Sequence, residues 1–452
     1  MDPVLLSRIQ FGLTAAFHFL FPPISIGLAW VIVYMGWRGL RTGERIYDQM
    51  TRFWVKILAL IFAAGVATGI ALEFQFGTNW ATYSRFVGDI FGSPLAAEGV
   101  FAFFLESGFL GVLILGRNRV SKKFYWFSSL MVAVGSTLSA FWIIVANSWQ
   151  QTPVAYQIVG EGAFRRAELT NFWLAVFNPS TLPRYFHTVV ASVLTGGFFV
   201  AGASAWYLLK GRHREFARRS LQIGLITSAV FSLLVLGVGH AHAVQVAETQ
   251  PAKMAAYEAL FETHDGAAMI IWGFPDVENQ TVRFNIAVPK LLSFLAYFDP
   301  NATIPGLDQF HREEWPPIAL SFYPYHLMVA LGMWFILLPW QGLFLKEKHF
   351  TNPIFLKAVL YSSLLPLLAM ELGWMATEFG RQPWVVYGLL KTEDAISAVV
   401  PAGQILATII LFVLIYTLIL ALLVYILKRE FEHGPDAEPP AQGTPAGAEV
   451  TV

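Results

Sequence analysis

The chain contains no cysteine, and that absence removes several kinds of chemistry. Disulfides, thiolate metal sites, iron–sulfur clusters and the C-x-x-C-H attachment of haem all require cysteine. Charge is scarce too: charged residues make up 13% of the 452 residues, against about 25% in an average soluble domain. Lys+Arg and Asp+Glu balance at 30 each, so no net field selects nucleic acid or an acidic partner. A water-soluble globular enzyme is therefore excluded.

Apolar residues are abundant, at 56% of the chain, and they gather in long runs. A helix needs about 20 apolar residues to cross the hydrocarbon of a membrane. The runs therefore predict an all-α membrane protein, a bundle of nine transmembrane helices. The predicted spans are roughly 12–35, 53–76, 95–116, 124–147, 185–209, 219–239, 318–345, 355–378 and 403–427.

The loops between these spans predict the orientation. Most lysines and arginines fall on short loops at one side, which should be cytoplasmic. The N-terminus then lies outside and the C-terminus inside, with the long segments 148–184, 240–317 and 379–402 outside. We divide the chain into helices 1 to 6 (1–239), an external segment (240–317), helices 7 to 9 (318–429) and a disordered cytoplasmic tail (430–452), which is rich in Pro, Ala, Gly and Glu.

Three residues at membrane depth are candidate iron ligands. His18 lies in span 1, His187 opens span 5 and Met328 lies in span 7. Each has an ordinary alternative, because such a histidine often bonds a neighbouring helix and such a methionine usually packs. A histidine and a methionine on two helices would give a six-coordinate haem suited to electron transfer. The sequence alone does not pair them.

Carboxylates inside spans form a second group, and such residues usually have a partner or a function. Glu98 and Glu106 lie eight residues apart, about 12 Å along a regular helix and some 80° around it. That spacing favours successive stations on a proton route, although protonated carboxylates bonded to other helices are the alternative. Glu378 shares a helical stripe with Trp374 and precedes Arg381. It is a candidate iron ligand, with Arg381 placed to neutralise a haem propionate, or else a simple helix cap.

The external segment contains KMAAYE, in which Lys253 and Glu258 lie five residues apart in a helix-compatible run. Taken alone, this run is typical of a solvated surface helix.

Several stretches together resemble subunit I of the cytochrome bd family of quinol:oxygen oxidoreductases. The resemblance runs from Leu5 to about Arg429. The stretches that carry it are SRIQFGLTAAFHFLFPP, GVATGIALEFQFGTNW, GSPLAAEGVFAFFLES, GSTLSAFWIIVANSWQQTP, FHTVVASVLTG, KMAAYEALFET and ELGWMATEFGRQPW. The last of these is highly specific.

The resemblance implies three haems near the outer face. His187 and Met328 correspond to the ligands of the low-spin haem b558. His18 and Glu378 correspond to ligands of the two high-spin haems, b595 and d, in an order that the sequence leaves open. A further haem b in place of haem d also stays open.

Other positions take roles from the same resemblance. Glu98 corresponds to a distal ligand or proton donor, while Glu106 and Ser139 resemble members of a proton route from the cytoplasm. Lys253 and Glu258 match a quinol-binding pair in the external "Q-loop". The remaining matches lie around the haems and are Arg8, Trp374 and Arg381.

The chain departs from the family pattern at two positions and in one length. His326 stands where the family often has an arginine, two residues before the methionine ligand. Asn118 stands where an acidic residue is common near the inner mouth of the proton route. The external segment is short, as in some cyanide-insensitive relatives.

The implied function is oxidation of ubiquinol or menaquinol outside and reduction of dioxygen to water with cytoplasmic protons, which builds a gradient without pumping. The family also implies a second membrane subunit, a single-helix small subunit in some members, and location in the bacterial cytoplasmic membrane. Two alternatives stay open: a membrane b-type cytochrome that does not reduce oxygen, and a proton-coupled transporter that uses Glu98 and Glu106. The transporter is disfavoured because no inverted repeat is visible.

Overall fold

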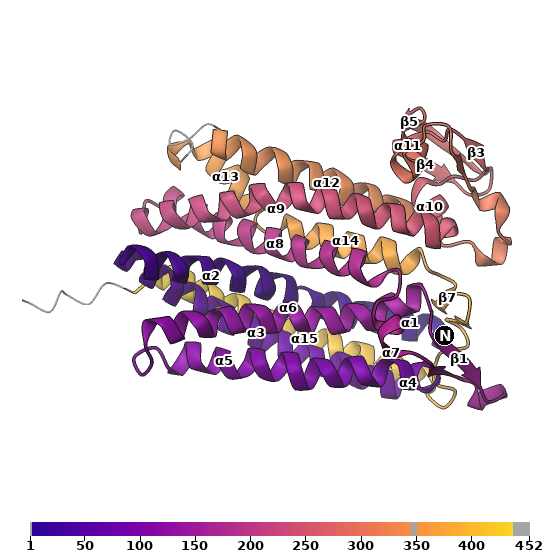
Figure 1. Cartoon of the computed structure of the whole chain (residues 1–452), viewed down its shortest axis with the longest axis horizontal. Coiled ribbons are helices and arrows are strands. Elements are labelled where there is room, and N and C mark those ends of the chain that lie inside the picture. The colour runs from indigo at the N-terminus through magenta and orange to yellow at the C-terminus, as the bar shows by residue number, and fades with distance from the viewer. Residues whose placement is uncertain (1, 345–349, 437–452) are drawn as a thin grey trace, which may run out of the picture.

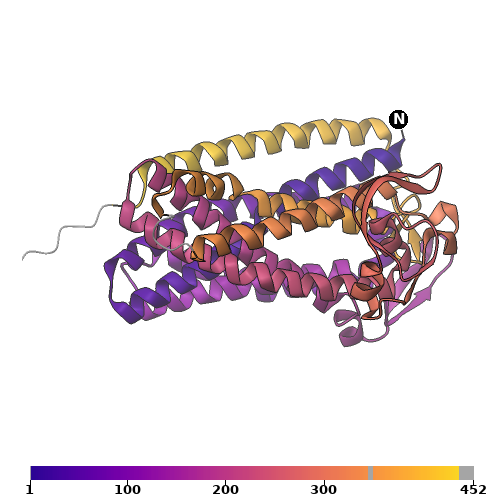
Figure 2. The same ribbon diagram turned by 90° about the horizontal axis from the view of Figure 1, so that it is seen from above.

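The computed structural model describes residues 2–344 and 350–436. Within those ranges, nine helical segments are long and apolar enough to cross a membrane, which confirms the predicted number. They run side by side along the long axis of the molecule (Figures 1 and 2). In chain order they are α1 with α2 (Pro3–Phe19, Pro22–Thr42), α3 (Arg45–Thr78), α4 with α5 (Ala81–Ala97, Phe104–Leu115), α6 (Lys122–Gln151), α8 (Thr181–Leu209), α9 (Arg214–Thr249), α12 (Ile318–Phe344), α13 with α14 (Pro353–Ser362, Leu365–Phe379) and α15 (Ala402–His433).

Several helices extend beyond the predicted spans. Helix α4 already begins at Ala81, and α9 continues to Thr249, inside the segment predicted to be external. Hydropathy marks only the depth of the hydrocarbon, whereas a helix continues until its backbone is capped or broken. Helix α15 likewise reaches His433, so residues 430–433, predicted to be disordered, are helical. Residues 437–452 of the predicted tail lie outside the described part.

The first span is bent rather than continuous. Helix α1 ends at Phe19 and α2 begins at Pro22, with a short break between them. Proline has no backbone N–H to donate, so the Pro22–Pro23 pair interrupts the helical hydrogen bonding, and α2 begins at Pro22. The break lies directly after His18 and leaves that residue in the last turn of α1.

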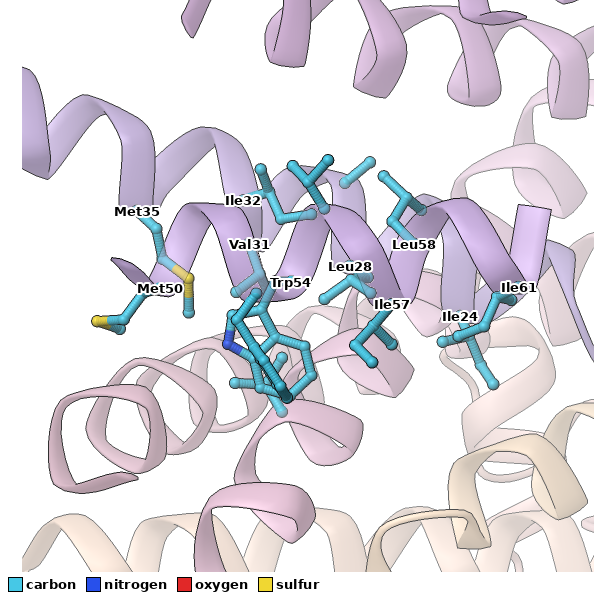
Figure 3. Packing of buried hydrophobic residues seen from close by; sticks show 14 of the residues in the cluster. Ile24, Leu28, Val31, Ile32, Met35, Met50, Trp54, Ile57, Leu58 and Ile61 are labelled. Atoms are coloured by element: carbon cyan, nitrogen blue, oxygen red, sulfur yellow. The ribbon is translucent and has the colours of Figure 1, made fainter. Parts of the chain in front are cut away.

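The largest buried cluster of apolar side chains is built mainly on α2 and α3. Figure 3 shows the apolar side chains of α2 and α3, among them Leu28 and Trp54, which are completely buried. Glycines allow α2 and α8 to touch through their backbones. A Cβ added at Gly27 would lie 2.1 Å from the Ser192 carbonyl oxygen, and one at Gly196 would lie 2.3 Å from Gly27. No larger side chain fits at this crossing.

Short elements gather at the end of the bundle that carries the N-terminus (Figure 1). They come from the three long segments 148–184, 240–317 and 379–402, which the sequence predicts on one side. The all-α prediction holds for the bundle, but the described part also contains four two-stranded antiparallel sheets that were not predicted. These elements are β1 (Tyr156–Val159) with β2 (Arg166–Leu169), β3 (His264–Asp265) with β6 (Thr303–Ile304), β4 (Met269–Asp276) with β5 (Thr281–Val288), β7 (Trp384–Val386) with β8 (Leu390–Lys391), and helices α7 (Phe172–Val176), α10 (Pro251–Glu258) and α11 (Leu291–Tyr297).

Candidate functional site

Glu378 lies at the last turn of α14 in a cluster of polar side chains. Its Oε1 accepts hydrogen bonds from Asn147 Nδ2 at 3.1 Å and from Gln151 Nε2 at 3.3 Å. Its Oε2 accepts a hydrogen bond from Arg381, and Arg184 Nη2 lies 3.9 Å from Oε1. Both arginines are buried, and the Nε atom of each has no partner among the described residues. Two guanidinium charges therefore face one carboxylate, which leaves the cluster able to hold a further anion.

The same cluster extends to the external helix α10. Lys253 is 1% exposed, and its Nζ donates to Gln151 Oε1 at 2.5 Å and to Gln250 Oε1 at 2.7 Å. Gln151 therefore contacts both Lys253 and Glu378. Lys253 adds a third basic side chain to the two arginines around Glu378.

Helix α10 is packed against the bundle rather than exposed. Every residue from Ala252 to Glu258 is buried, which is incompatible with a solvated surface helix. The approach depends on Gly380, directly before Arg381 in the GRQPW stretch. A Cβ at Gly380 would lie 2.8 Å from Lys253 Cγ and 3.1 Å from Tyr257 Cε1. The glycine of this motif thus makes room for the external helix.

Lys253 and Glu258 point to different neighbours. Glu258 Oε2 accepts a hydrogen bond from the backbone N–H of Ile270 in β4 at 3.3 Å, while its Oε1 is buried without a partner in the described ranges. Burial raises the pKa of Glu258 from its ordinary value of 4.5 to about 8. Burial also lowers the pKa of Lys253 well below its usual value. The two side chains share no hydrogen-bond partner among those described, because five residues of helix turn them apart.

Each of the three candidate ligands His18, His187 and Met328 packs against a glycine on another helix. A Cβ on that glycine would approach the ligand side chain to about 3 Å, closer than ordinary contact. The pairs are His18 Cε1 with Gly69 (3.1 Å), His187 Cε1 with Gly239 (3.0 Å) and Met328 Sδ with Gly373 (2.8 Å). The glycines therefore fix where these side chains lie.

The hydrogen bond of His18 determines which ring nitrogen is free. Its Nδ1 lies 3.0 Å from Thr68 Oγ1, and the hydroxyl of Thr68 donates to backbone carbonyls one turn earlier. Since the hydroxyl has a single hydrogen, its oxygen accepts from Nδ1–H of His18. The Nε2 atom then carries the lone pair, as a metal-binding imidazole requires.

His187 and Met328 lie on different helices, α8 and α12, and a series of neighbouring residues connects them. His187 follows Arg184 by one turn of α8, and the Arg184 guanidinium lies over the ring of Trp374 at 5.4 Å. Trp374 is adjacent to Gly373, against which Met328 packs. The Nδ1 atom of His187 is buried and lacks a partner in the described part of the chain. These positions are compatible with two ligands of one group.

Glu98 and Glu106 face the same side of α6. Ser139 Oγ donates to Glu98 Oε1 at 2.7 Å, and a Cβ at Gly135, one turn away from Ser139, would lie 2.9 Å from Glu106 Cβ. The expected 80° offset holds for a regular helix, and the stretch between these two residues is not regular. The cause is a π-helical turn over Glu98–Phe103, because i→i+5 bonding accommodates an extra residue and rotates Glu98 toward the face of Glu106.

Two further positions named from the sequence are Arg8 and His326. Arg8 has no hydrogen bond or ion pair within the ranges that the structure describes, and it lies ten residues before His18 on α1. The ring of His326 does not point to an open position. Its Nδ1 lies 2.9 Å from the Phe322 carbonyl oxygen and its Nε2 lies 2.6 Å from that of Ile270.

Sequence reasoning missed Arg184 and Gln151, two central members of the Glu378 cluster. Arg184 is a charged residue at the start of a predicted span, three residues before a candidate ligand, and that position was a usable signal. Gln151 lies in the WQQTP stretch that carries part of the resemblance. Its role could not be recognised, because its partners come from α10 and α14.

A family model described as cytochrome bd terminal oxidase subunit I matches residues 6–435. The cytochrome bd ubiquinol oxidase subunit 1 of Bacillus subtilis (strain 168) is 38% identical over 96% of this chain and 95% of its own length. The cytochrome bd-II ubiquinol oxidase subunit 1 of Escherichia coli (strain K12) is 35% identical, over 98% and 99%.

A further relative and a solved structure extend these similarities. The putative cytochrome bd menaquinol oxidase subunit I of Bacillus subtilis (strain 168) is 31% identical over 96% of this chain and 98% of its own length. The structure of the bd oxidase from Geobacillus thermodenitrificans superposes with a TM-score of 0.90 at 30% identity, covering 96% of this chain and 99% of that one.

The buried carboxyl of Glu258 predicts a pH dependence of the external segment. Its raised pKa means that the folded state binds the proton more tightly than the unfolded state. The stabilisation is complete below about pH 4.5 and is lost as the pH rises through about 8. Each pKa unit corresponds to about 1.36 kcal/mol, so the loss should reach a few kcal/mol. Hydrogen exchange of α10 and β4 between pH 5 and 9 should show it.

Glu258→Gln should remove this part of the pH dependence, whereas Glu262→Gln at a nearby exposed position should keep it. Equal pH profiles for the wild type and Glu258→Gln would contradict the prediction.

Proposed function

Because the chain belongs to the cytochrome bd terminal oxidase subunit I family, we propose that it is the haem-bearing subunit of a respiratory quinol:oxygen oxidoreductase. The observation that carries the proposal is the match over residues 6–435, which includes every candidate site residue. The buried cluster around Glu378 supports it, because the cluster connects a candidate quinol residue with a candidate iron ligand.

The residues fit haem groups. The His18 tautomer leaves a nitrogen lone pair free, His187 has an unpartnered buried nitrogen, and the excess of guanidinium donors near Glu378 suits propionates. His187 and Met328 would hold haem b558, while His18 and Glu378 would hold the two high-spin groups, haem b595 and haem d or a further haem b. Trp374, Arg381 and Arg8 would contact these groups. Bound haem would supply iron that transfers electrons and binds dioxygen.

Quinol would bind beside α10. Glu258 has a pKa near the working pH, which suits a group that takes a proton from quinol and releases it outside. Lys253 is held by two amide oxygens and would act mainly as a fixed donor to a quinol oxygen. The divergence of the two side chains supports separate roles, one for the proton and one for orientation.

Protons for water would come from the opposite side of the membrane, through Glu106 and then Glu98. Ser139 of α6 bonds the Glu98 carboxyl, and Glu106 packs through its Cβ and backbone against Gly135 of the same helix. With the N-terminal end outside, quinol protons are released outside while cytoplasmic protons are consumed. Each charge separated against about 100 mV stores about 2.3 kcal/mol without a pump.

The expected assembly includes a second membrane subunit and, in some relatives, a single-helix peptide. Helix α15 supports a lipid or protein neighbour, because only 6% of its apolar window is buried within the chain. We place the complex in the bacterial cytoplasmic membrane. The relatives' names include both ubiquinol and menaquinol, so either quinol is a candidate substrate.

The function is tested by oxygen uptake of the purified complex with a soluble quinol, together with a reduced-minus-oxidised spectrum. An oxidase should consume oxygen and show low-spin and high-spin haem bands. Haem bands without oxygen uptake would favour the electron-transfer cytochrome, and a colourless protein would favour the transporter.

His187→Ala should remove the low-spin haem selectively, because the imidazole is its proposed ligand while the Glu378 cluster stays intact. The low-spin band should disappear from the difference spectrum with the high-spin bands retained. His264→Ala, at an exposed position in β3, is the control. Retention of the low-spin band in His187→Ala would refute the ligand assignment.

Glu106→Gln should slow oxygen reduction by roughly 10²-fold while haem content stays near normal, because the amide keeps the shape but cannot relay a proton. Turnover and haem content of the same preparation are the measurements. Glu215→Gln, at the exposed start of α9, should leave turnover unchanged. Loss of all haem from Glu106→Gln would indicate a structural or ligand role instead.

A further inference from the structure

We infer that Gln151 is a positioning residue that couples the candidate quinol residue Lys253 to the candidate haem ligand Glu378 through its one side-chain amide. The inference rests on the proposed function and assigns a role to a residue outside the proposed ligand, proton and quinol sets. It starts from geometry: Gln151 is completely buried, with Lys253 Nζ 2.5 Å from its Oε1 and Glu378 Oε1 3.3 Å from its Nε2.

The chemistry of the two partners fixes the orientation of the amide. A lysine side chain only donates hydrogen bonds at the distances seen here, and an ionised carboxylate only accepts them. The Gln151 oxygen must therefore face Lys253 and its nitrogen must face Glu378. Exchanging the two ends would place a donor against a donor and an acceptor against an acceptor. The amide can satisfy both partners in one orientation only.

The amide side chains next to Gln151 make other hydrogen bonds and do not take over its role. It is the last residue of α6, and Asn147, one turn earlier, donates to the same Glu378 oxygen. Gln150 accepts instead from Arg381 Nη1 at 2.9 Å. Gln250 contacts Lys253 but has no described bond to Glu378. Gln151 is thus the side chain of the described cluster that bonds both Lys253 and Glu378.

Through Gln151, a change in the hydrogen bonding of Lys253 at the quinol position affects Glu378. A ligand oxygen that draws Lys253 Nζ away weakens its bond to Gln151 Oε1. Because hydrogen bonds in a chain polarise one another, the amide N–H then becomes a poorer donor to Glu378. The charge on the carboxylate, and with it the electronic state of a haem bound there, responds to occupancy of the quinol position.

Three variants of the intact oxidase separate the two ends of the amide. Gln151→Leu removes both bonds at similar volume. Gln151→Glu keeps an oxygen for Lys253 but places a second carboxylate against Glu378. Gln250→Leu removes an acceptor from Lys253 and leaves the contacts of Glu378 as they are. The readouts are the KM for a soluble quinol and the position of the high-spin haem bands, with the low-spin band as an internal reference.

We expect Gln151→Leu to raise KM by roughly tenfold, the effect of losing a hydrogen bond to a charged group, and to shift the high-spin bands. Gln151→Glu should shift the bands with KM near the wild-type value, and Gln250→Leu should raise KM with unshifted bands. If Gln151→Leu changes only KM, only the high-spin bands, or neither of them, the coupling is overturned. If Gln151→Leu does not assemble, the contrast between the other two variants decides: the opposite pattern, or no contrast, overturns it.

A wild-type complex that binds no haem or does not oxidise quinol would instead overturn the proposed function. That failure is visible before any variant is compared.

Discussion

The ionic cluster around Glu378 is the interaction on which the N-terminal end of the bundle depends. One carboxylate, two arginines and a lysine lie together there, contributed by α14, α8, α10 and the loop after α14. Charges taken out of water are tolerated only with close partners, and removing one partner typically costs 3–5 kcal/mol. The cluster therefore ties the external segment to the bundle and holds the site in one arrangement.

Glycines provide the space that this arrangement needs. Gly27 and Gly196 allow two spans to touch, Gly380 admits α10, and three other glycines receive the candidate ligands. Small residues matter more at such crossings in a membrane, where apolar side chains gain little by leaving lipid. The glycines thus set the positions of α10 and of the candidate ligand side chains, and the charges around Glu378 set how its neighbours are oriented.

The sequence was sufficient to predict the helical bundle but not the side-chain contacts within it. Hydropathy predicted nine spans because about 20 apolar residues are needed for each crossing. It could not predict the break before Pro22 or the π turn at Glu98, since both are local changes within an apolar run. The partnership of Gln151 with Lys253 depends on residues about 100 positions apart, and no periodicity along the chain reveals it.

The ring of His326 connects two parts of the molecule that the sequence separates widely. It lies on α12, two residues before Met328, and reaches the carbonyl oxygen of Ile270 in β4. The N–H of the same Ile270 holds Glu258. The imidazole thus joins β4 to α12, beside the ring contact of Trp272 with Tyr323. Displacing β4 would therefore disturb α12 close to Met328, so a change in the segment between α9 and α12 can reach the bundle.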